Sequence, residues 1–194
     1  MPPRVFLVSP VRLDGVRGRL LREGRGRSAL AEALRSPDGA PIGDVFTYIS
    51  GLYFRGKLTY ARRFTRPPTG ARWLARGVLV ITQNRGLVPA DSRIVRSHLD
   101  AFAGTDIAED EADFVTPLQR DAESLLAAIG DGDVVLLGSL ATPKYLAPLS
   151  RVLGNRLVVP SVLHGKGDMA RGALLLRHAK SGQELAYEVG RAKR

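Results

Sequence analysis

The chain has 194 residues and is 44% hydrophobic, which is enough for the core of one full-sized domain. Because its 29 Lys and Arg residues outnumber its 19 Asp and Glu residues, its net charge is +10, an excess that points to a polyanionic partner such as nucleic acid. The absence of cysteine excludes disulfides and thiolate chemistry, and three scattered histidines disfavour a zinc site, so neither a metal nor a cofactor is expected.

The N-terminal segment MPPRVFLVSP predicts a first strand rather than a signal peptide, because its apolar run is short and no small-residue cleavage site follows. Residues 4–10, RVFLVSP, form a continuous apolar run that ends at a Ser-Pro pair, which is typical of a strand buried on both faces. No stretch approaches the roughly 18 apolar residues of a membrane span. We therefore expect a cytoplasmic protein without a membrane partner.

A basic segment and a short helix are expected next. Residues 14–27, DGVRGRLLREGRGR, consist mainly of Gly and Arg and predict a mobile basic loop or arm. Residues 28–34 open with Ser28, a typical N-cap residue, and predict a helix.

Residues 44–64 predict a longer helix, capped by Asp44 and broken near Gly51. Its basic residues are assigned to the solvent side, where they would contact nucleic acid: Arg55, Lys57, Arg62 and Arg63. Its aromatic residues either stack on bases or, as is more common, belong to the core: Tyr48, Tyr53, Phe54 and Tyr60.

The second half of the chain alternates strands with helices. Further strands are expected at 77–83, 133–139 and 156–163, and helices at 117–130 and 142–154. The last helix has Thr142 as N-cap, Pro143 at its first position and Gly154 as its stop. This alternation predicts a single α/β domain over 1–194, with a mostly parallel central sheet flanked by helices.

The C-terminal region fits two arrangements. Residues 173–189 form either a hairpin about KSGQ or a helix followed by a strand, and the alternation of Leu185, Tyr187 and Val189 favours the hairpin. The segment 190–194, GRAKR, is expected to be a loose basic tail.

The charge is unevenly distributed. Residues 1–76 carry 15 Lys and Arg against five Asp and Glu, residues 77–133 carry four against 11, and residues 134–194 carry ten against three. If the two basic segments meet in space, they form one positive face, opposite an acidic one, that attracts a phosphate backbone. The alternative is an arginine-rich composition without a polyanionic partner.

Ligands of open α/β sheets bind beyond the carboxyl ends of the strands, so the polar residues after each strand are candidates for anion binding. They are Ser9 and Pro10 after the first strand, Gln83, Asn84 and Arg85 after the second, Ser139, Thr142, Lys144 and Tyr145 after the third, and His164, Lys166, Asp168 and Arg171 after the fourth.

Two of these segments suit an anion. In GSLATPKY, 138–145, a helix start with a lysine and a tyrosine nearby suits a phosphate, although a plain Thr-Pro cap explains the same residues. In VLHGKGDMARG, 162–172, flexible backbone with Lys166 and Arg171 suits an anion-contacting loop, and the alternative is a local ion pair between Asp168 and Arg171.

The candidates for catalysis are Asp168 and His164 as general acid or base, together with Lys144. Lys144 would act as a Schiff-base amine, although a phosphate contact is the commoner role of such a lysine. No spacing indicates a catalytic triad, and no G-x-S-x-G nucleophile elbow is present.

The order of several short motifs resembles a known superfamily. The segments VFLVSP, LYFRGKLTYA, LVITQNRGLVPAD, DVVLLGSLATPKY and VVPSVLHGKGDMARG follow one another over roughly 4–172. In this order they resemble the YaaA-like superfamily, which includes the bacterial peroxide-stress protein, related uncharacterised domains and the accessory domain of archaeosine synthases. The GL-x-P motif of that superfamily corresponds to GLVP, 86–89, in this chain. The tyrosine that often follows this motif is missing from 92–105, and the chain is shorter than the peroxide-stress protein.

The resemblance implies an α/β fold and association with DNA or another nucleic acid, and some relatives sit in enzymes that modify nucleobases in RNA. The superfamily positions fall on Ser9, Pro10, Gly86, Leu87, Pro89, Ala141, Tyr145, Ala170, Arg171 and Gly172.

Three functions remain open at this point. The first is a nucleic-acid-binding protein, most simply a DNA-binding one, that acts through a basic face. The second is an enzyme acting on a nucleotide or nucleobase, glycosylase-like or transferase-like, with a phosphate pocket at the strand ends. The third is a module whose acidic segment, 100–123, docks a basic protein.

Overall fold

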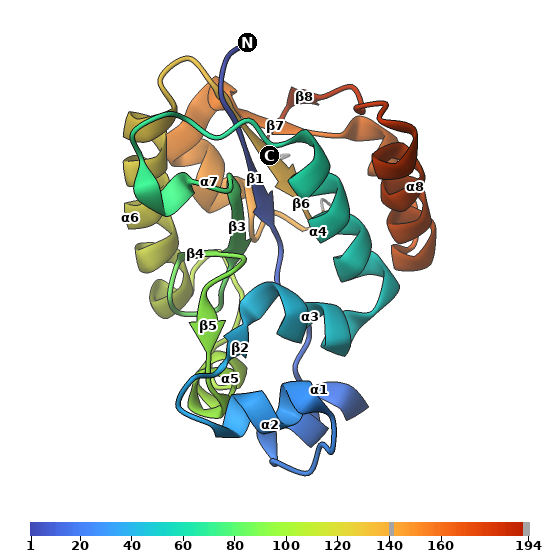
Figure 1. The fold of residues 1–194 in the computed structure, drawn as a ribbon. Coiled ribbons are helices and arrows are strands. Elements are labelled where there is room, and N and C mark those ends of the chain that lie inside the picture. Colours follow the sequence, from blue (N-terminus) through green and yellow to red (C-terminus); the bar gives the residue numbers. More distant parts are fainter. Residues whose placement is uncertain (140–141, 192–194) are drawn as a thin grey trace.

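The computed structural model describes residues 1–139 and 142–191. Within these ranges a central sheet lies between helices on both faces (Figure 1). The strands are β1 (Arg4–Val8), β2 (Ala40–Pro41), β3 (Val78–Ile81), β4 (Leu87–Pro89), β5 (Arg93–Ile94), β6 (Asp133–Leu137), β7 (Leu157–Val159) and β8 (Glu188–Val189). The helices are α1 (Val16–Arg22), α2 (Ala29–Arg35), α3 (Ile42–Ser50), α4 (Leu52–Phe64), α5 (Arg96–Ala103), α6 (Ala112–Ile129), α7 (Leu146–Leu153) and α8 (Asp168–Ser181).

The six-stranded main sheet has the order β4-β3-β1-β6-β7-β8. Its four inner strands, β3, β1, β6 and β7, run parallel, and the two edge strands pair antiparallel with their neighbours. The strands β2 and β5 form a separate antiparallel pair. This arrangement is the mostly parallel α/β sheet expected from the sequence.

Alternate residues of β1 enter two different cores. Phe6 and Val8 pack with α4 and α8, whereas Val5 and Leu7 pack with α6 and α7. All four are fully buried, because each face of the sheet is covered by helices (Figure 1). The continuous apolar run therefore correctly predicts a strand buried on both faces.

The N-terminal third departs from the sequence expectations in residues 14–27. The sequence predicts a loop or arm there, but the segment contains α1, which buries Leu21 against the core. The backbone of α1 packs closely against the backbone of Leu13 at Gly18, where a side chain would collide with it. Ser28 caps α2 as expected, its hydroxyl accepting a hydrogen bond from the N–H of Ala31 at 3.3 Å.

The predicted break in the 44–64 helix is confirmed. Gly51 separates α3 from α4 and has a φ of +66°, a conformation that favours glycine. The predicted cap at Asp44 is wrong, because α3 begins two residues earlier, at Ile42, with Pro41 in the N-cap position.

In the second half of the chain, two helices also begin at positions other than those expected from the sequence. The segment that follows β3 turns back and pairs with it as the antiparallel strand β4. The helix α6 begins at Ala112, so Pro117, which was expected near its start, lies inside the helix. The predicted Thr142 cap is wrong: α7 begins at Leu146 and has Tyr145 as its N-cap residue, although it ends at Gly154 as expected. Residues 140–141 and 192–194, which include Ala141 and most of the predicted tail, lie outside the described ranges.

At the C-terminus, residues 173–189 form a helix followed by a strand, so the favoured hairpin about KSGQ is wrong and the other arrangement is confirmed. The antiparallel C-terminal pair is present between β7 and β8, with α8 connecting the two strands. The KSGQ turn lies at the end of α8, where Gly182 adopts a left-handed conformation with a φ of +72°.

Among the described residues, no helix combines the length and the apolar character needed to cross a membrane.

Candidate active site

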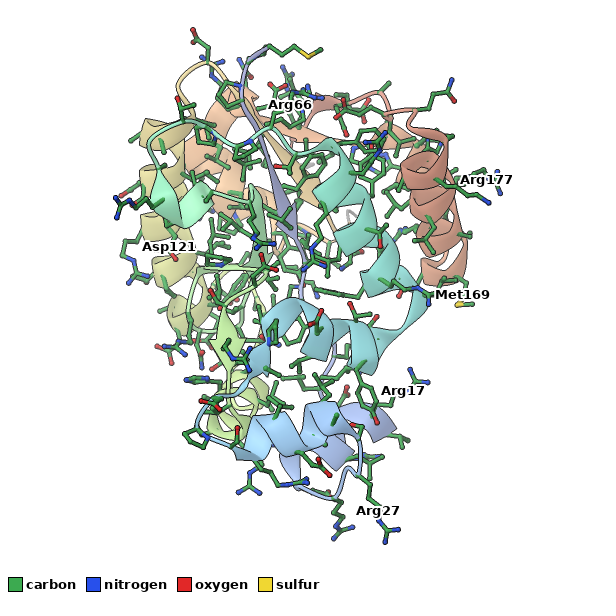
Figure 2. All side chains as sticks on the ribbon, in the orientation of Figure 1. Arg17, Arg27, Arg66, Asp121, Met169 and Arg177 are labelled. Atoms are coloured by element: carbon green, nitrogen blue, oxygen red, sulfur yellow. The ribbon has the colours of Figure 1, made fainter. Side chains whose placement is uncertain are left out.

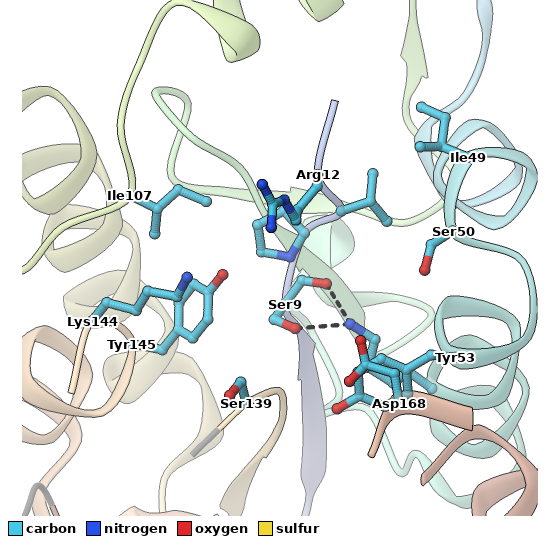
Figure 3. A pocket seen from close by; sticks show the side chains of 13 residues that line it. Ser9, Arg12, Ile49, Ser50, Tyr53, Ile107, Ser139, Lys144, Tyr145 and Asp168 are labelled. Carbon is cyan, nitrogen blue, oxygen red and sulfur yellow. Dashed lines mark hydrogen bonds between the residues drawn. The ribbon is translucent and has the colours of Figure 1, made fainter. Parts of the chain in front are cut away.

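A pocket of about 340 Å³ opens at the carboxyl ends of β1 and β6 (Figure 3). This volume lies at the lower end of the range for small-molecule sites. Several residues proposed from the sequence line it: Ser9, Pro10, Lys57, Ser139, Lys144, Tyr145 and Asp168. They converge because β1 and β6 are parallel neighbours, so that the segments following both strands leave the sheet at the same edge.

Lys57 lines this pocket and is only 2% exposed. Its Nζ donates hydrogen bonds to the carbonyl oxygen of Ser9 at 2.7 Å and to the hydroxyl of Ser9 at 2.8 Å (dashed in Figure 3). The predicted position of Lys57 on the solvent side of its helix is therefore wrong. The helix α4 contacts β1 and β3 of the sheet as well as α8, so that most of its circumference is covered.

Burial changes the acidity of this amine. The pKa of Lys57 falls to about 7, chiefly because burial penalises the charged form; the negative charge of Asp168 raises the pKa, and the positive charge of Arg171 lowers it. The centroids of the Tyr53 and Phe54 rings lie 4.6 Å and 5.0 Å from Nζ, and these rings favour the ammonium form. At neutral pH the side chain is thus present as both amine and ammonium.

Two tyrosines flank the pocket (Figure 3). The hydroxyl of Tyr53 is buried and has no hydrogen-bond partner of regular geometry among the described residues. Burial raises the pKa of Tyr53, while the nearby guanidinium of Arg171 acts in the opposite direction. Burial also raises the pKa of Tyr145, whose ring packs edge-on against Phe114. Both hydroxyls therefore remain protonated at neutral pH and are able to donate hydrogen bonds.

Asp168 begins α8, and its carboxylate is mostly exposed at the pocket. It lies 3.5 Å from a guanidinium nitrogen of Arg171, whose Nε donates a hydrogen bond to the carbonyl oxygen of Leu163 at 3.1 Å. These contacts match the ion-pair alternative for this segment. Lys166 and His164 are exposed and do not line the pocket.

Several other sequence candidates also lie outside the pocket. Asn84 donates hydrogen bonds to the carbonyl oxygen of Ala101 and to the hydroxyl of Thr105, and with Arg85 it lines a separate pocket beside α6. Arg55 and Thr142 are exposed. The structure therefore divides the predicted site residues between different parts of the surface.

The pocket also contains residues that were not proposed as site residues from the sequence. Arg12 lines it and pairs with Asp14 at 2.9 Å, and Ser50 contributes a hydroxyl from the end of α3. Arg12 lies two residues after the Ser-Pro pair that ends β1, so its place near the end of this strand could have been predicted from the sequence. Ser50 has no comparable signal, because only the folding of α3 towards β1 brings it there.

Part of the acidic segment pairs with the basic segments. Acids from residues 77–133 pair with arginines of the basic segments: Arg4 with Asp133, Arg22 with Asp100, Arg62 and Arg76 with Asp91, and Arg156 with Asp131. The labelled arginines project from different sides of the molecule, Arg17 and Arg27 near α1 and α2, Arg66 at the opposite end and Arg177 from α8 (Figure 2).

Among the described residues, no three His, Cys, Asp or Glu side chains cluster so as to hold a metal ion. Comparison with known proteins finds no match for this chain among protein-family models, curated proteins or solved structures. The resemblance to the YaaA-like superfamily therefore stays a prediction from the order of its motifs.

Proposed function

We propose that this chain is a cytoplasmic enzyme that acts on a nucleotide or nucleobase in the pocket at the carboxyl ends of β1 and β6. The observation that carries the proposal is the buried amine of Lys57, which lines this pocket without a carboxylate within salt-bridge distance among the described residues. An amine whose pKa lies near 7 exchanges protons readily at neutral pH, and groups of this kind are concentrated at catalytic sites.

The other lining residues suit a phosphorylated ligand. Lys144 supplies positive charge at the pocket, Arg12 adds a guanidinium that is paired with Asp14, and Asp168 supplies an exposed carboxylate. The Tyr53 hydroxyl is a buried donor whose partner a ligand would provide. A phosphate held by the two cations would leave the rest of the ligand in contact with the tyrosine and Lys57.

Nucleotides are expected to stabilise the fold. A ligand present at 100 times its dissociation constant adds about 2.7 kcal/mol to the free energy of unfolding and raises the melting temperature by several degrees. Thermal denaturation against a panel of nucleoside monophosphates, nucleosides and inorganic phosphate measures this. Lys144→Ala should abolish the shift given by monophosphates.

The matched control is Lys180→Ala, which removes an exposed lysine from the far end of α8. It should leave the nucleotide-induced shift unchanged. A panel that gives no shift with the wild-type protein contradicts the proposed function, and an equal loss in both variants contradicts the assigned phosphate position.

A second candidate function is nucleic-acid binding, which the net charge of +10 and the cluster of arginines around α1 favour. Arg17, Arg19 and Arg27 are exposed there, and Figure 2 shows Arg17 and Arg27 projecting outwards. This function is compatible with the first, because a nucleotide of a longer strand enters an enzyme pocket when it is flipped out of the stack.

Binding to duplex DNA should weaken with salt, with a slope of log affinity on log salt of about −0.9 per phosphate contacted. Replacing Arg17, Arg19 and Arg27 together by Gln should make this slope less negative by about two to three. The control replaces three exposed arginines elsewhere, with the same change in charge: Arg72, Arg151 and Arg177. Fluorescence anisotropy at several salt concentrations measures the slope. Equal slopes for the two triple variants exclude a binding face at α1.

A further inference from the structure

We infer that Lys57 is a nucleophile that forms an imine with the carbonyl carbon of a phosphorylated sugar aldehyde. The inference rests on the pocket of the proposed function and names the substrate class and the reacting atom. It assigns to Lys57 the covalent role that the sequence suggested for Lys144.

The hydrogen bonds of Lys57 suit the neutral amine. Both acceptors belong to Ser9, and the Nζ to oxygen distances are 2.7 Å and 2.8 Å. A neutral amine has two N–H groups, which these acceptors satisfy, and it retains a lone pair on nitrogen for attack on an electrophile. An ammonium group has three N–H groups, and among the described residues no third acceptor is within hydrogen-bond distance.

The surroundings of the amine allow this form to coexist with the ammonium form, because they do not hold the ammonium in an ion pair. Lys57 makes no salt bridge with a described carboxylate; Asp168 acts on it only through its charge, and Arg171 partly opposes that effect. A pKa of about 7 gives comparable amounts of amine and ammonium at neutral pH. Lys144, in contrast, lies at the half-exposed rim, with its Nζ 5.2 Å from the centre of the Tyr145 ring. Lys144 is therefore suited to hold an anion.

The lining of the pocket fits a sugar phosphate. Three serines, Ser9, Ser50 and Ser139, bring hydroxyl groups to the pocket, together with the buried hydroxyl of Tyr53. Such groups pair with the hydroxyls of a short polyol chain. Lys144, together with the guanidinium of Arg12 that is paired with Asp14, supplies the charge for a terminal phosphate.

The covalent step balances without an added reactant. The Nζ lone pair attacks the carbonyl carbon, and the π electrons of the C=O bond move to its oxygen. Both hydrogens of the amine then leave with this oxygen as water, and a C=N bond remains between substrate and Lys57. Protonation by solvent gives the iminium ion, which sodium cyanoborohydride reduces to a stable secondary amine.

The test is reductive trapping with 2-deoxyribose 5-phosphate as the probe, followed by peptide mass spectrometry. The chain has five lysines, Lys57, Lys144, Lys166, Lys180 and Lys193, so each adduct is assigned to one position. At pH 7 Lys57 should be labelled at least ten times faster than the exposed Lys166 and Lys180. Unphosphorylated 2-deoxyribose should label it at least ten times more slowly than the phosphorylated probe.

Lys57→Arg keeps a basic side chain but forms no imine; it should lose this adduct and keep those at the exposed lysines. Labelling of Lys57 no faster than that of Lys166 and Lys180 in the wild-type protein overturns the inference, and this comparison needs no variant. Equal labelling by the two sugars overturns the assigned substrate class. If nucleotides stabilise the fold while Lys57 is not labelled, the inference fails and the proposed function stands. If Lys57 is labelled while no nucleotide stabilises the fold, the imine-forming role stands and the proposed nucleotide function fails.

Discussion

Raising the pH from 6.5 to 9 is expected to stabilise the wild-type protein relative to Lys57→Met by about 2 to 3 kcal/mol. The pKa of Lys57 is about 7 in the folded protein, and a lysine in the unfolded chain has its ordinary pKa, near 10.4. Between these two values the unfolded state binds more protons than the folded state, so the free energy of unfolding rises with pH. Each pH unit in that interval contributes about 1.4 kcal/mol.

The variant provides the control for other titrating groups. Met is apolar and similar in length, so Lys57→Met removes the titration while keeping most of the packing. The charged and titratable groups that face Lys57, namely Asp168, Arg171 and Tyr53, are present in both proteins. Urea denaturation of both proteins at pH 6.5 and 9 measures the effect. A difference between them that does not change with pH shows that Lys57 has an ordinary pKa, which contradicts the buried amine.

The sequence predicts the framework of the fold because that framework depends on local patterns. The apolar run within residues 4–10 forms a strand because its own side chains are buried. The glycine at position 51 separates two helices because its own backbone adopts a positive φ. Both predictions agree with the structure. The predicted start of α7 is wrong because Thr142 and Pro143 form a plausible cap locally, while the packing of the following residues places the first helical residue at Leu146.

The candidate site is predicted in part, for a geometric reason. Segments that follow parallel strands meet at one edge of the sheet, and this rule finds Ser9, Ser139 and Asp168 without knowledge of the fold. The rule gives no information on how far each segment then departs from the edge. It therefore also selects Asn84 and His164, which lie outside the pocket.

Lys57 shows why a buried charge escapes sequence reasoning. A lysine among arginines is assigned to the solvent, because buried lysines are rare. The neighbouring pattern nevertheless contains a signal: Tyr53 lies four residues before Lys57, and Tyr60 and Ala61 lie three and four residues after it, so all share one helix face. Apolar residues on both sides of a lysine at this spacing indicate a face that is covered on folding.

Gly56→Ala is expected to destabilise the protein by about 2 kcal/mol, although alanine favours helices over glycine by about 1 kcal/mol. The helices α4 and α8 make the most extensive helix–helix contact among the described elements, and Gly56 faces Gly172 there. A Cβ atom at position 56 would lie 2.7 Å from the carbonyl oxygen and 2.9 Å from the Cα of Gly172. Both are backbone atoms, so the helices must separate, and the resulting loss of packing outweighs the gain in helix propensity.

Gly104→Ala is the matched control, because its Cβ would make only ordinary contacts at 3.7 Å and its φ of −85° suits alanine. It should change the free energy of unfolding by less than about 0.5 kcal/mol. Urea denaturation of the two variants measures the difference. Because α4 carries Lys57 and Tyr53 and α8 carries Asp168, separating these helices also widens the pocket, so Gly56→Ala should slow the reductive labelling of Lys57. A Gly56→Ala protein as stable as the control would show that the two helices do not cross at these glycines.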